Sequence, residues 1–449
     1  MNQELKFFLI TDTHYYAYEK LGYSDDKDQK CMNESGAIID AVFEKFLQED
    51  EIDIILIAGD LTNNGEVDSH KGFIERLNRL KEAGKKVYVI TATHDYGLRE
   101  ISDGESVGKD DGKVLRSDLR DLYLDFGFSS AIAEHKSLSY VAQLAPGFRL
   151  LALNDDGDGR SFCGYDQDQL DWILNQIKEA QDAGDFIFAM THHPMLPPTP
   201  MYPLISERDM LGNYKEVAKI LADAGLQIIF TGHTHIVNIG SMVTDKGNEI
   251  WDVNTGSLVG YPTPIRRVEI NNSQMQITTE RIEDFEWDRK GMGAQEYLAA
   301  HFDSYLGDLF DSMANDFERF TQLAVGFSLE REKAEKFKIP IKFTGKILQK
   351  LTLGHLSKLL FVSRKVDKSV KDILLKDLIL EIVRNIFSGN EHYSPDTPMH
   401  QALILMIGRL SKLVPGLKKK GYPLDDLPDF VSSLIYDPTP DHEALIPLK

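Results

Sequence analysis

Acidic and imidazole side chains recur directly after short apolar runs in the first half of the sequence. Carboxylates and imidazoles bind metal ions and transfer protons near neutral pH, so their repetition predicts chemistry at one site. Each apolar run has the length of a buried β-strand, and the polar residues that follow it fall at a strand end. These residues are Asp12 with His14, Asp60, Thr93 with His94 and Asp95, His192 with His193, and His233 with His235.

The composition of this set favours a pair of transition-metal ions. Imidazole suits zinc, iron, copper and nickel, and carboxylate also admits manganese. Two carboxylates and several histidines are more ligands than one tetrahedral ion needs. Two ions about 3.5–4 Å apart, sharing one bridging carboxylate, would use them. Such a pair would bind two oxygens of a phosphate and lower the pKa of a bridging water, which makes a hydroxide nucleophile.

Each residue taken alone has an ordinary structural explanation. An Asp after a strand often caps a helix or a turn, and a single His at a strand end is more often hydrogen-bonded within the fold than bound to a metal. Gly-His-Thr-His at 232–235 is more specific, because two imidazoles one residue apart in a turn can face one site. Five such strand ends in order argue for a shared site and against coincidence.

The elements that position these residues alternate between apolar runs and helical patterns, as in an α/β domain. The runs are apolar on successive residues, as expected for strands covered on both faces. Because the ligand crevice of such a sheet lies outside the carboxyl ends of its strands, we expect the five strand ends to meet at one edge of one sheet. The expected strands are 5–10, 52–58, 86–92, 148–153, 186–190 and 226–230, and the expected helices are 37–47, 66–83 and 166–183.

The pattern changes along the rest of the chain. Residues 251–282 show short alternating stretches, which predict a second sheet built from hairpins. Residues 96–134 begin polar and glycine-rich, and we expect an insertion or lid above the sheet. After residue 290 strand signals become sparse, so we divide the chain into a catalytic domain, 1–290, and a mostly helical domain, 291–449. The helices expected in the second domain are 294–323, 369–387 and 400–413.

Charge and composition narrow the class of protein. The chain of 449 residues has a formal net charge of −21, which argues against a broad nucleic-acid or anionic-membrane surface. A small phosphorylated substrate is compatible with this charge, because bound metal ions reverse the local field. Cys31 and Cys163 show neither metal-ligand spacing nor a disulfide framework. Without a visible signal peptide or a span of about 20 apolar residues, we expect a cytoplasmic enzyme with no membrane segment. An export segment removed beforehand would leave no trace in the sequence.

The five motifs in order resemble those of the calcineurin-like metallophosphoesterases. That family carries Asp-x-His, Gly-Asp, Gly-Asn-His-Asp or Glu, a His before x-Pro, and Gly-His-x-His, and the resemblance covers roughly residues 5–270. It implies an α/β fold, a four-layer αββα sandwich of two mixed sheets, to which this chain adds a C-terminal helical domain. The alternating region after Trp251 agrees with a second sheet.

The resemblance also implies a role for each matched residue and a cofactor of two metal ions, whose identity among Mn, Fe, Zn and Ni stays open. His94 would face the leaving-group oxygen as a proton donor, or stabilise the transition state, with Asp95 orienting it. The implied metal ligands are Asp12, His14 and His235 for the first ion, Asp60 as the bridge, and His192 and His233 for the second ion.

One position departs from the family pattern. Thr93 stands where the family has an Asn whose carboxamide oxygen ligates the second metal. A threonine hydroxyl is shorter and a poorer neutral ligand, so the second site would be weaker, completed by water or a neighbour, or left to a single ion. We keep Thr93 as a candidate ligand and still expect two metals, because Asp60, His192 and His233 remain.

The substrate is inferred from the resemblance alone. The chain looks most similar to class III cyclic-nucleotide phosphodiesterases, which implies a small phosphodiester substrate such as a cyclic nucleotide. The alternatives are a phosphomonoesterase with the same site, a non-catalytic metal-binding or scaffold protein of the same fold, and a nuclease, which the acidic charge disfavours. Thr93, His94 and Tyr15 are expected to contact the substrate, and the loop 194–203 to border it. The helical domain is expected to cap the site, form a homodimer or stabilise the catalytic domain.

Overall fold

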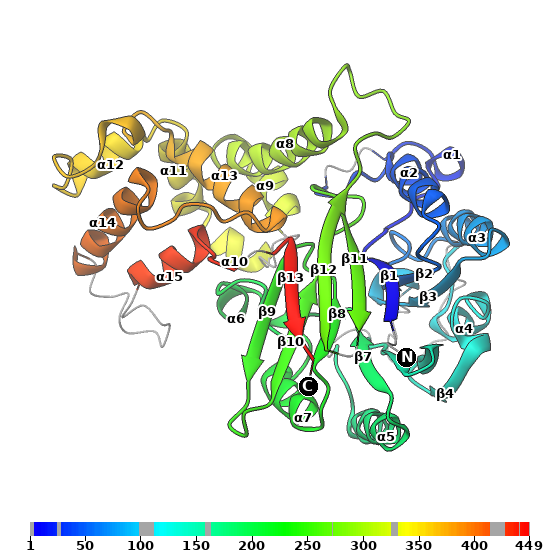
Figure 1. Cartoon of the computed structure of the whole chain (residues 1–449). Coiled ribbons are helices and arrows are strands. Elements are labelled where there is room, and N and C mark those ends of the chain that lie inside the picture. The colour runs from blue at the N-terminus through cyan, green and yellow to red at the C-terminus, as the bar shows by residue number, and fades with distance from the viewer. Residues whose placement is uncertain are drawn as a thin grey trace, which may run out of the picture.

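Two mixed sheets face each other between layers of helix, and a helical part lies to one side (Figure 1). Phe7 of the first sheet stacks on Phe188 of the second at a ring-centroid distance of 5.3 Å and meets Phe230 edge-on at 5.7 Å. The main core therefore lies between the sheets, and the expected four-layer sandwich with a helical addition is confirmed. The computed structural model describes residues 4–24, 28–97, 112–157, 163–271, 273–324, 331–413, 427–439 and 441–448.

The first sheet has six strands in the order β13-β12-β11-β1-β2-β3. The three strands β1, β2 and β3 are parallel, while the hairpin β11–β12 and the last strand β13 are antiparallel to their neighbours. The bounds are β1 Glu4–Ile10, β2 Ile54–Ala58, β3 Lys86–Ile90, β11 Pro264–Asn271, β12 Gln274–Arg281 and β13 Glu443–Pro447.

The second sheet has seven strands in the order β4-β5-β6-β7-β8-β10-β9. Its centre, β6-β7-β8-β10, is parallel, and antiparallel strands close both edges. The bounds are β4 Ala131–His135, β5 Ser139–Ala145, β6 Phe148–Ala152, β7 Phe186–Met190, β8 Ile228–Thr231, β9 Asn238–Val243 and β10 Glu249–Asn254.

Helices cover the outer face of each sheet. Phe46 of α2 stacks on Phe8 of the first sheet at 4.6 Å, and Ile177 of α5 packs with Ile187 and Ile229 of the second sheet. Helix α5 begins where the Asp166 carboxylate accepts the N–H of Gln169, as an N-cap does. The bounds are α1 Tyr18–Leu21, α2 Ser35–Gln48, α3 Val67–Glu82, α4 Leu119–Leu122, α5 Gln167–Ala183, α6 Tyr202–Ile205 and α7 Tyr214–Asp223, with short 3₁₀ turns η1 Thr93–Asp95, η2 Arg116–Asp118, η3 Phe128–Ser130 and η4 Glu207–Asp209.

The distribution of strands between the sheets differs from the sequence expectation. The strands that carry the polar residues were placed in one sheet, but β1, β2 and β3 belong to the first sheet and β7 and β8 to the second. The region 251–282 is also divided, because β10 extends the second sheet while β11 and β12 pair beside β1. A buried strand pattern indicates burial on both faces, and it carries no information about which strand lies alongside.

The expectation that residues 96–134 form an insertion or lid above the sheet is wrong for residues 112–134, which the structure describes. Residues 98–111 lie outside the described residues. Farther along, Leu119 and Tyr123 are fully buried in the main core, and β4 forms an edge of the second sheet. This stretch therefore belongs to the sandwich.

The helical part follows the sandwich and then returns to it. The helix expected over 294–323 is broken at Asp316, whose φ of −135° and ψ of 87° are not helical. The division at residue 290 stays a prediction, but the expected helical domain does not run to the end of the chain, because β13 pairs with β12 in the first sheet. The helices are α8 Ala294–Asn315, α9 Phe317–Ala324, α10 Arg331–Lys336, α11 Lys338–Leu348, α12 Leu353–Leu359, α13 Leu375–Ser388, α14 Pro398–Leu413 and α15 Leu427–Ile435, with the 3₁₀ turn η6 Lys368–Val370.

A buried arginine ties the returning segment to both sheets. Arg266 of β11 has no exposed surface and donates to the main-chain oxygens of Asn254 and Asp441, and to the hydroxyl groups of Thr255 and Thr279. Burial lowers the pKa of Arg266 to about 10, and the nearby Asp441 opposes that shift. The guanidinium group therefore satisfies oxygens from β10, from β12 and from the segment before β13.

We expect Arg266→Met to lower the free energy of unfolding by about 2–4 kcal/mol, because two buried main-chain oxygens lose their donor. The neighbouring Arg267 is a matched control, since it is partly exposed and pairs with Glu49 at 2.8 Å. Arg267→Met should cost less than about 1 kcal/mol. Urea denaturation measures both variants, and equal losses would contradict the proposed tie.

Candidate metal centre

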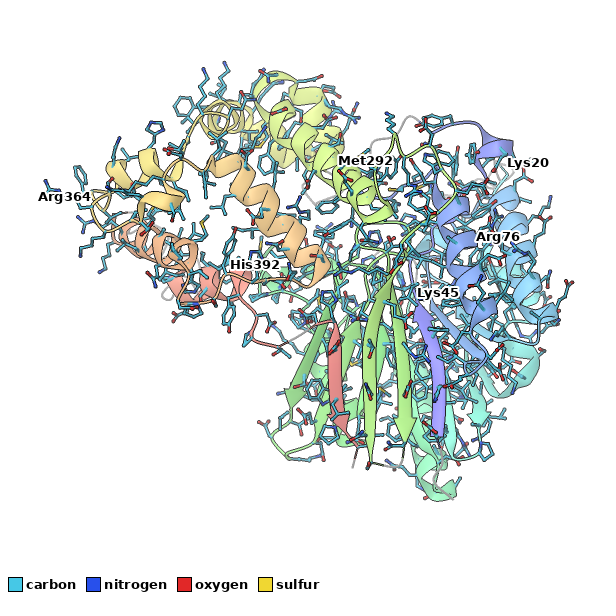
Figure 2. All side chains as sticks on the ribbon, turned by 45° about the horizontal axis from the view of Figure 1, so that its top comes forward. Lys20, Lys45, Arg76, Met292, Arg364 and His392 are labelled. Atoms are coloured by element: carbon cyan, nitrogen blue, oxygen red, sulfur yellow. The ribbon has the colours of Figure 1, made fainter. Side chains whose placement is uncertain are left out.

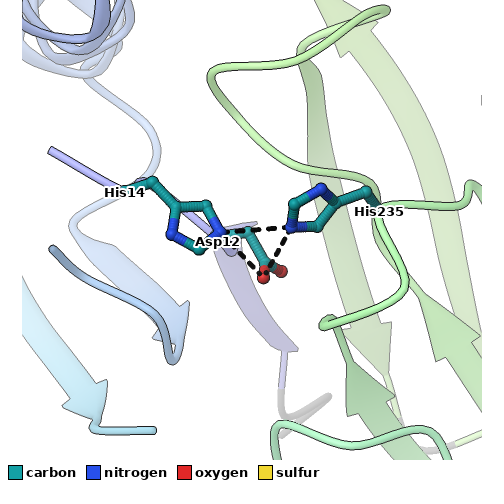
Figure 3. Close-up of side chains that lie close together, drawn as sticks. All are labelled: Asp12, His14 and His235. Carbon is teal, nitrogen blue, oxygen red and sulfur yellow. Dashed lines mark hydrogen bonds and ion pairs between the residues drawn. The ribbon is translucent and has the colours of Figure 1, made fainter. Parts of the chain in front are cut away.

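The first group of potential metal ligands joins the end of β1 to the turn after β8. His14 Nε2 lies 3.1 Å from His235 Nε2. Both ring nitrogens point at Asp12 Oδ1, at 3.6 Å from His14 and 3.3 Å from His235 (Figure 3). Three donor atoms from segments more than 200 residues apart in the chain thus converge, as the spacing of one metal site requires.

The second group lies directly beside the first. It consists of Asp60, His192 and His233, whose donor atoms lie within 4.8 Å of one another. His192 Nε2 is 3.1 Å from Asp60 Oδ2, and that same oxygen is 3.8 Å from His14 Nε2 of the first group. Asp60 Oδ2 therefore lies between the two groups, at the position that a bridging carboxylate would occupy.

The backbone at these positions is strained in one common way. Among the described residues, ten other than glycine have a positive φ, and five of these are in the two ligand groups. Non-glycine residues adopt this left-handed region at a cost, and such strain concentrates at functional sites. The five residues are Asp12 with φ 51°, His14 with φ 35°, Asp60 with φ 50°, His233 with φ 65° and His235 with φ 58°.

Two close approaches at the strand ends require glycine. At Gly59, with φ 91°, an added Cβ would lie 2.7 Å from His192 Nδ1. At Gly232 an added Cβ would overlap the side chains of Thr11 and Asp12. Both glycines stand immediately before a potential ligand, so they let the ends of the two sheets approach closely enough for the ligand groups to meet.

Counting hydrogen-bond donors shows that the side chains fit metal ions. His192 Nδ1 donates to the main-chain oxygen of Ala58 at 2.9 Å, and His235 Nδ1 lies 3.2 Å from the carboxamide oxygen of Gln29. Nε2 of each ring then faces carboxylate oxygens, which are acceptors, so a proton or a metal ion has to lie between the two. His192 Nε2 and Asp12 Oδ1 are buried and have no hydrogen-bond partner among the described residues. A cation between such acceptors satisfies them all.

Two imidazoles and the bridging carboxylate are held in the forms that bind metals. Burial, together with Lys30, lowers the pKa of His14 to about 3, and burial beside His193 and His192 holds the pKa of His233 well below its usual value. Burial would raise the pKa of Asp60, but the imidazoles of His192 and His94 outweigh it and lower that pKa. Neutral imidazoles and ionised carboxylates are the forms that bind metals. Burial would lower the pKa of His192, but Asp60 and Asp12 outweigh it and raise that pKa well above its usual value, so a metal ion would have to displace the His192 proton.

His94 lies at the same place, but Asp95 does not orient its ring. The His94 ring meets the His14 ring edge-on at 5.0 Å, and its Nδ1 donates to the main-chain oxygen of Asn63. The Asp95 carboxylate instead accepts the N–H groups of Thr62 and Ala92, both at 2.9 Å. Asp95 therefore shapes the loops on either side of His94, and the main chain of Asn63 performs the orienting role predicted for Asp95.

One expected substrate contact is corrected. Tyr15 is buried, its ring stacks on Phe73, and its hydroxyl accepts from Arg76 at 2.9 Å, so it belongs to the core. In the loop 194–203, Met195 is fully buried and its N–H donates to Asp252 at 2.7 Å, so this one side chain faces the core. The expectation that the loop borders the substrate stays a prediction. Side chains beside a ligand in sequence point to the opposite side of the loop when the backbone is extended.

Thr93 opens the turn η1 and is partly buried. Neither ligand group depends on it, because each already holds three side chains of other types. Its predicted roles as a ligand and a substrate contact stay predictions.

Sequence reasoning missed the residues that hold the ligands in place. Asp155, after β6, accepts the N–H of His192 at 3.0 Å, the N–H of His193 at 2.7 Å and the ring Nδ1 of His193 at 3.0 Å. Burial would lower the pKa of His193, but Asp155 outweighs it and raises that pKa to about 10. His193 is therefore a charged partner of Asp155, and its ring lies 4.0 Å from that of His233. The same strand-end rule that found the ligands would have found Asp155.

A second missed segment, 28–34, carries polar groups to the other side of the centre. Gln29 bonds His235, and the nearly buried Lys30 donates to the side-chain oxygen of Asn63 at 3.3 Å. Helix α8 supports the segment, because His301 Nε2 lies 2.9 Å from the main-chain oxygen of Asp28. No spacing in the sequence marks this loop, since its residues meet the site only through tertiary packing.

Comparison with known proteins decides the family. The family described as calcineurin-like phosphoesterase matches residues 5–237, which is more than half of the chain. The chain belongs to the calcineurin-like phosphoesterase family. The family resemblance found in the motifs is thus confirmed, and the two ligand groups occupy strand ends within the matched region.

Individual relatives of this family are distant. The chain is 23% identical over 185 residues to a probable glycerophosphodiester phosphodiesterase GpdQ of Arcobacter nitrofigilis, covering 41% of this chain and 55% of that protein. The chain therefore spans about half the length of this curated relative. A dimetal phosphatase from Danio rerio is 13% identical, with a TM-score of 0.47 over 62% of this chain and 96% of that one. Purple acid phosphatase PPD1 from yellow lupin is 11% identical, with a TM-score of 0.44 over 63% and 52%.

We expect Gly59→Ala to abolish stoichiometric metal binding, because its Cβ would displace the His192 ring. Gly84→Ala is the matched control, with φ 90° but nothing within 4 Å of the added Cβ. Gly84→Ala should keep full metal content. Its free energy of unfolding should fall only by the strain of a left-handed alanine, about 1–2 kcal/mol. Metal analysis after dialysis, with thermal denaturation, separates the two effects. Full metal content in folded Gly59→Ala protein would refute the proposed close approach.

Asp155→Asn should weaken metal affinity by about 10–100-fold, because partners that orient metal-binding histidines typically contribute that much. Asp252→Asn is a close control. Asp252 is also buried and accepts two main-chain N–H groups and a threonine hydroxyl, but these belong to Met195, Leu196 and Thr231. Titration of metal-stripped protein should show an unchanged affinity for Asp252→Asn. Equal affinities for the two variants would refute the positioning role of Asp155.

Proposed function

We propose that this chain is a two-metal phosphoesterase that hydrolyses a small phosphodiester. The observation that carries the proposal is the pair of adjacent ligand groups, with Asp60 Oδ2 3.1 Å from His192 Nε2 and 3.8 Å from His14 Nε2. Asp12, His14 and His235 would hold one ion, Asp60 would bridge, and His192 and His233 would hold the other. When bound, such a pair activates a water molecule and neutralises phosphate charge.

The residues around the ligands supply binding and proton transfer. The Asn63 main-chain oxygen fixes the proton on Nδ1 of His94, so Nε2 is the atom that would face a departing ester oxygen. Burial lowers the pKa of His94, so proton donation from Nε2 would need the negative charge of a bound phosphate to restore the imidazolium form. Lys30, held by Asn63 and by Asp28 at 3.5 Å, adds a fixed positive charge beside His94 and His14. That charge attracts an anionic substrate into a chain whose net charge is −21.

A small diester is the preferred substrate class. A cyclic nucleotide follows from the similarity of the motifs to class III phosphodiesterases, and the glycerophosphodiester class follows from the name of the distant relative. A phosphomonoesterase would use the same ligands. A scaffold that had lost activity would have no need of five left-handed residues whose strain serves only to gather ligands.

The decisive experiment removes and restores the metals. Stripped protein should not cleave bis-p-nitrophenyl phosphate, and Mn, Zn, Fe or Ni should restore cleavage. Asp60→Asn should lose metal and activity together. His94→Gln should keep its metals while kcat falls by about 10²–10⁴-fold, the typical contribution of a general acid. His135→Gln, a substitution outside both ligand groups, is the control and should keep metal content and kcat.

The ratio of rates identifies the ester class. Bis-p-nitrophenyl phosphate, cyclic AMP and glycerophosphocholine represent diesters, and p-nitrophenyl phosphate represents monoesters. Faster turnover of diesters supports the proposal, while a preference for the monoester assigns the alternative. Folded, metal-loaded protein that cleaves none of these compounds would sink the enzyme proposal and favour a scaffold.

A further inference from the structure

One stretch of the helical part has a positive net charge, opposite in sign to the net charge of the whole chain. Acidic residues outnumber lysine and arginine by 71 to 50 overall. From Lys336 to Lys365, however, the sequence has eight lysine or arginine residues and no aspartate or glutamate. These residues are Lys336, Lys338, Lys342, Lys346, Lys350, Lys358, Arg364 and Lys365.

One face of helix α11, which lies in this stretch, packs against helix α8. At Gly345 an added Cβ would lie 2.7 Å from the main-chain nitrogen of Ala314 and 2.8 Å from Met313 Cβ, so α11 crosses α8 in close contact. Ile341 packs beside the buried cluster that contains Phe317 and Phe320. This face fixes the orientation of the helix.

The opposite face of α11 exposes large apolar side chains. Ile339 is 82% exposed, Phe343 64% and Ile347 40%. Residues four apart lie on the same side of a helix, so these three form one stripe. Lys342 and Lys346 flank the stripe on one side, and neither forms an ion pair with any residue that the structure describes. The result is an apolar ridge bordered by unneutralised positive charge.

The segment after α12 repeats this combination. Leu359 is 69% exposed and Phe361 is 85% exposed, and Phe361 has a positive φ of 60°. Arg364 and Lys365 follow directly and are exposed. Figure 1 shows α12 at the end of the helical part farthest from the sheets, and Figure 2 shows Arg364 at the outer rim of the molecule. The segment therefore lies away from the metal centre.

We propose that the exposed face of α11 binds the surface of an anionic phospholipid bilayer, and that the turn after α12 adds a second contact of the same kind. Stable peripheral binding takes two signals, apolar insertion and attraction of basic residues to acidic headgroups, and this face carries both. None of the described helices is long and apolar enough to cross a membrane.

The charge pattern favours a lipid surface over other partners. A second copy of this chain would bring the same positive charges against themselves, and the repulsion would oppose a symmetric dimer on this face. Nucleic acid would use the lysines, but a phosphate backbone gains nothing from exposed Ile339, Phe343 and Phe361. An acidic bilayer accepts both parts, because lysines reach the headgroups while apolar side chains enter the acyl boundary.

The proposal departs from an expectation that rests on composition. A net charge of −21 argued against an anionic-membrane surface, but the charge is not evenly distributed. With a Debye length of about 8 Å at physiological salt, a basic face at one end of the molecule is screened from the acidic remainder. The acidic remainder would then turn away from the membrane, which gives the bound protein one orientation.

Cosedimentation of the full-length protein with vesicles tests the proposal. Vesicles of phosphatidylcholine with about one third phosphatidylglycerol should bind the protein, pure phosphatidylcholine should not, and raised salt should weaken the binding. The triple variant Lys342→Glu, Lys346→Glu, Lys350→Glu should bind at least about a hundredfold less tightly, at roughly fivefold for each charge removed. The double variant Ile339→Ser, Phe343→Ser, which keeps every charge, should bind at least about tenfold less tightly.

Matched controls change the same residue types on the sandwich. The triple variant Lys178→Glu, Lys219→Glu, Lys246→Glu and the double variant Ile132→Ser, Val243→Ser should bind as the unaltered protein does. Lys342 is partly buried and the other substituted residues are exposed, and circular dichroism verifies that the variants fold.

Four outcomes would overturn the proposal. The first is no sedimentation with anionic vesicles at low salt, and the second is an equal loss in the sandwich controls. The third is a dimer in analytical ultracentrifugation, dissociated by Phe343→Ser, without vesicle binding, which would assign the face to self-association. The fourth is tight binding of duplex DNA or RNA that depends on the lysines and not on Ile339 or Phe343, which would assign it to nucleic acid.

Discussion

The structure depends on one cluster of buried carboxylate oxygens and imidazole nitrogens. These atoms face one another with too few protons to pair them all. Asp12 and His192 are fully buried. Oδ1 of Asp12 and Nε2 of His192, the atoms that would bind a metal, have no hydrogen-bond partner among the described residues. A buried carboxylate without a positive partner costs several kcal/mol, so the arrangement calls for positive charge. Asp60 and Asp12 outweigh burial and raise the pKa of His192, so a proton on His192 supplies this charge, and a bound metal ion would supply it in place of that proton. The strained loops, the small residues before the ligands and the supporting carboxylates all serve to maintain this one cluster.

Hydrogen bonds between loops hold the ligand residues in their left-handed backbone conformations. The N–H of His14 donates to the main-chain oxygen of Asp60 at 2.9 Å, which continues the pairing of β1 and β2 beyond the strands. Across the interface between the sheets, the N–H of His233 donates to Asp12 Oδ2 at 3.0 Å. One carboxylate oxygen of Asp12 thus fastens the turn from the second sheet, while the other faces the histidine nitrogens. The fold and the metal centre therefore share the same side chains.

The helical part is joined to this arrangement at several places. The N–H of Val237, two residues after His235, donates to the main-chain oxygen of Phe387 at 3.2 Å in α13. Tyr297 of α8 donates to Glu34 at 2.6 Å, beside the segment that brings Gln29 to His235. The helices thus support two of the loops that carry or contact ligands. Among the described residues, none in α11 or α12 forms a main-chain hydrogen bond with these loops.

The sequence by itself determined the ligand types, their order and the elements that carry them. Each strand end with a carboxylate or imidazole was visible because burial imposes an apolar run and the residue after it breaks the run. The tertiary structure decided how those strand ends meet, because strand pairing depends on contacts between distant segments. It divided the strands between two sheets, placed Tyr15 in the core, and brought Gln29 and Lys30 to the centre. A local pattern records whether a residue is buried, whereas what it is buried against depends on the rest of the chain.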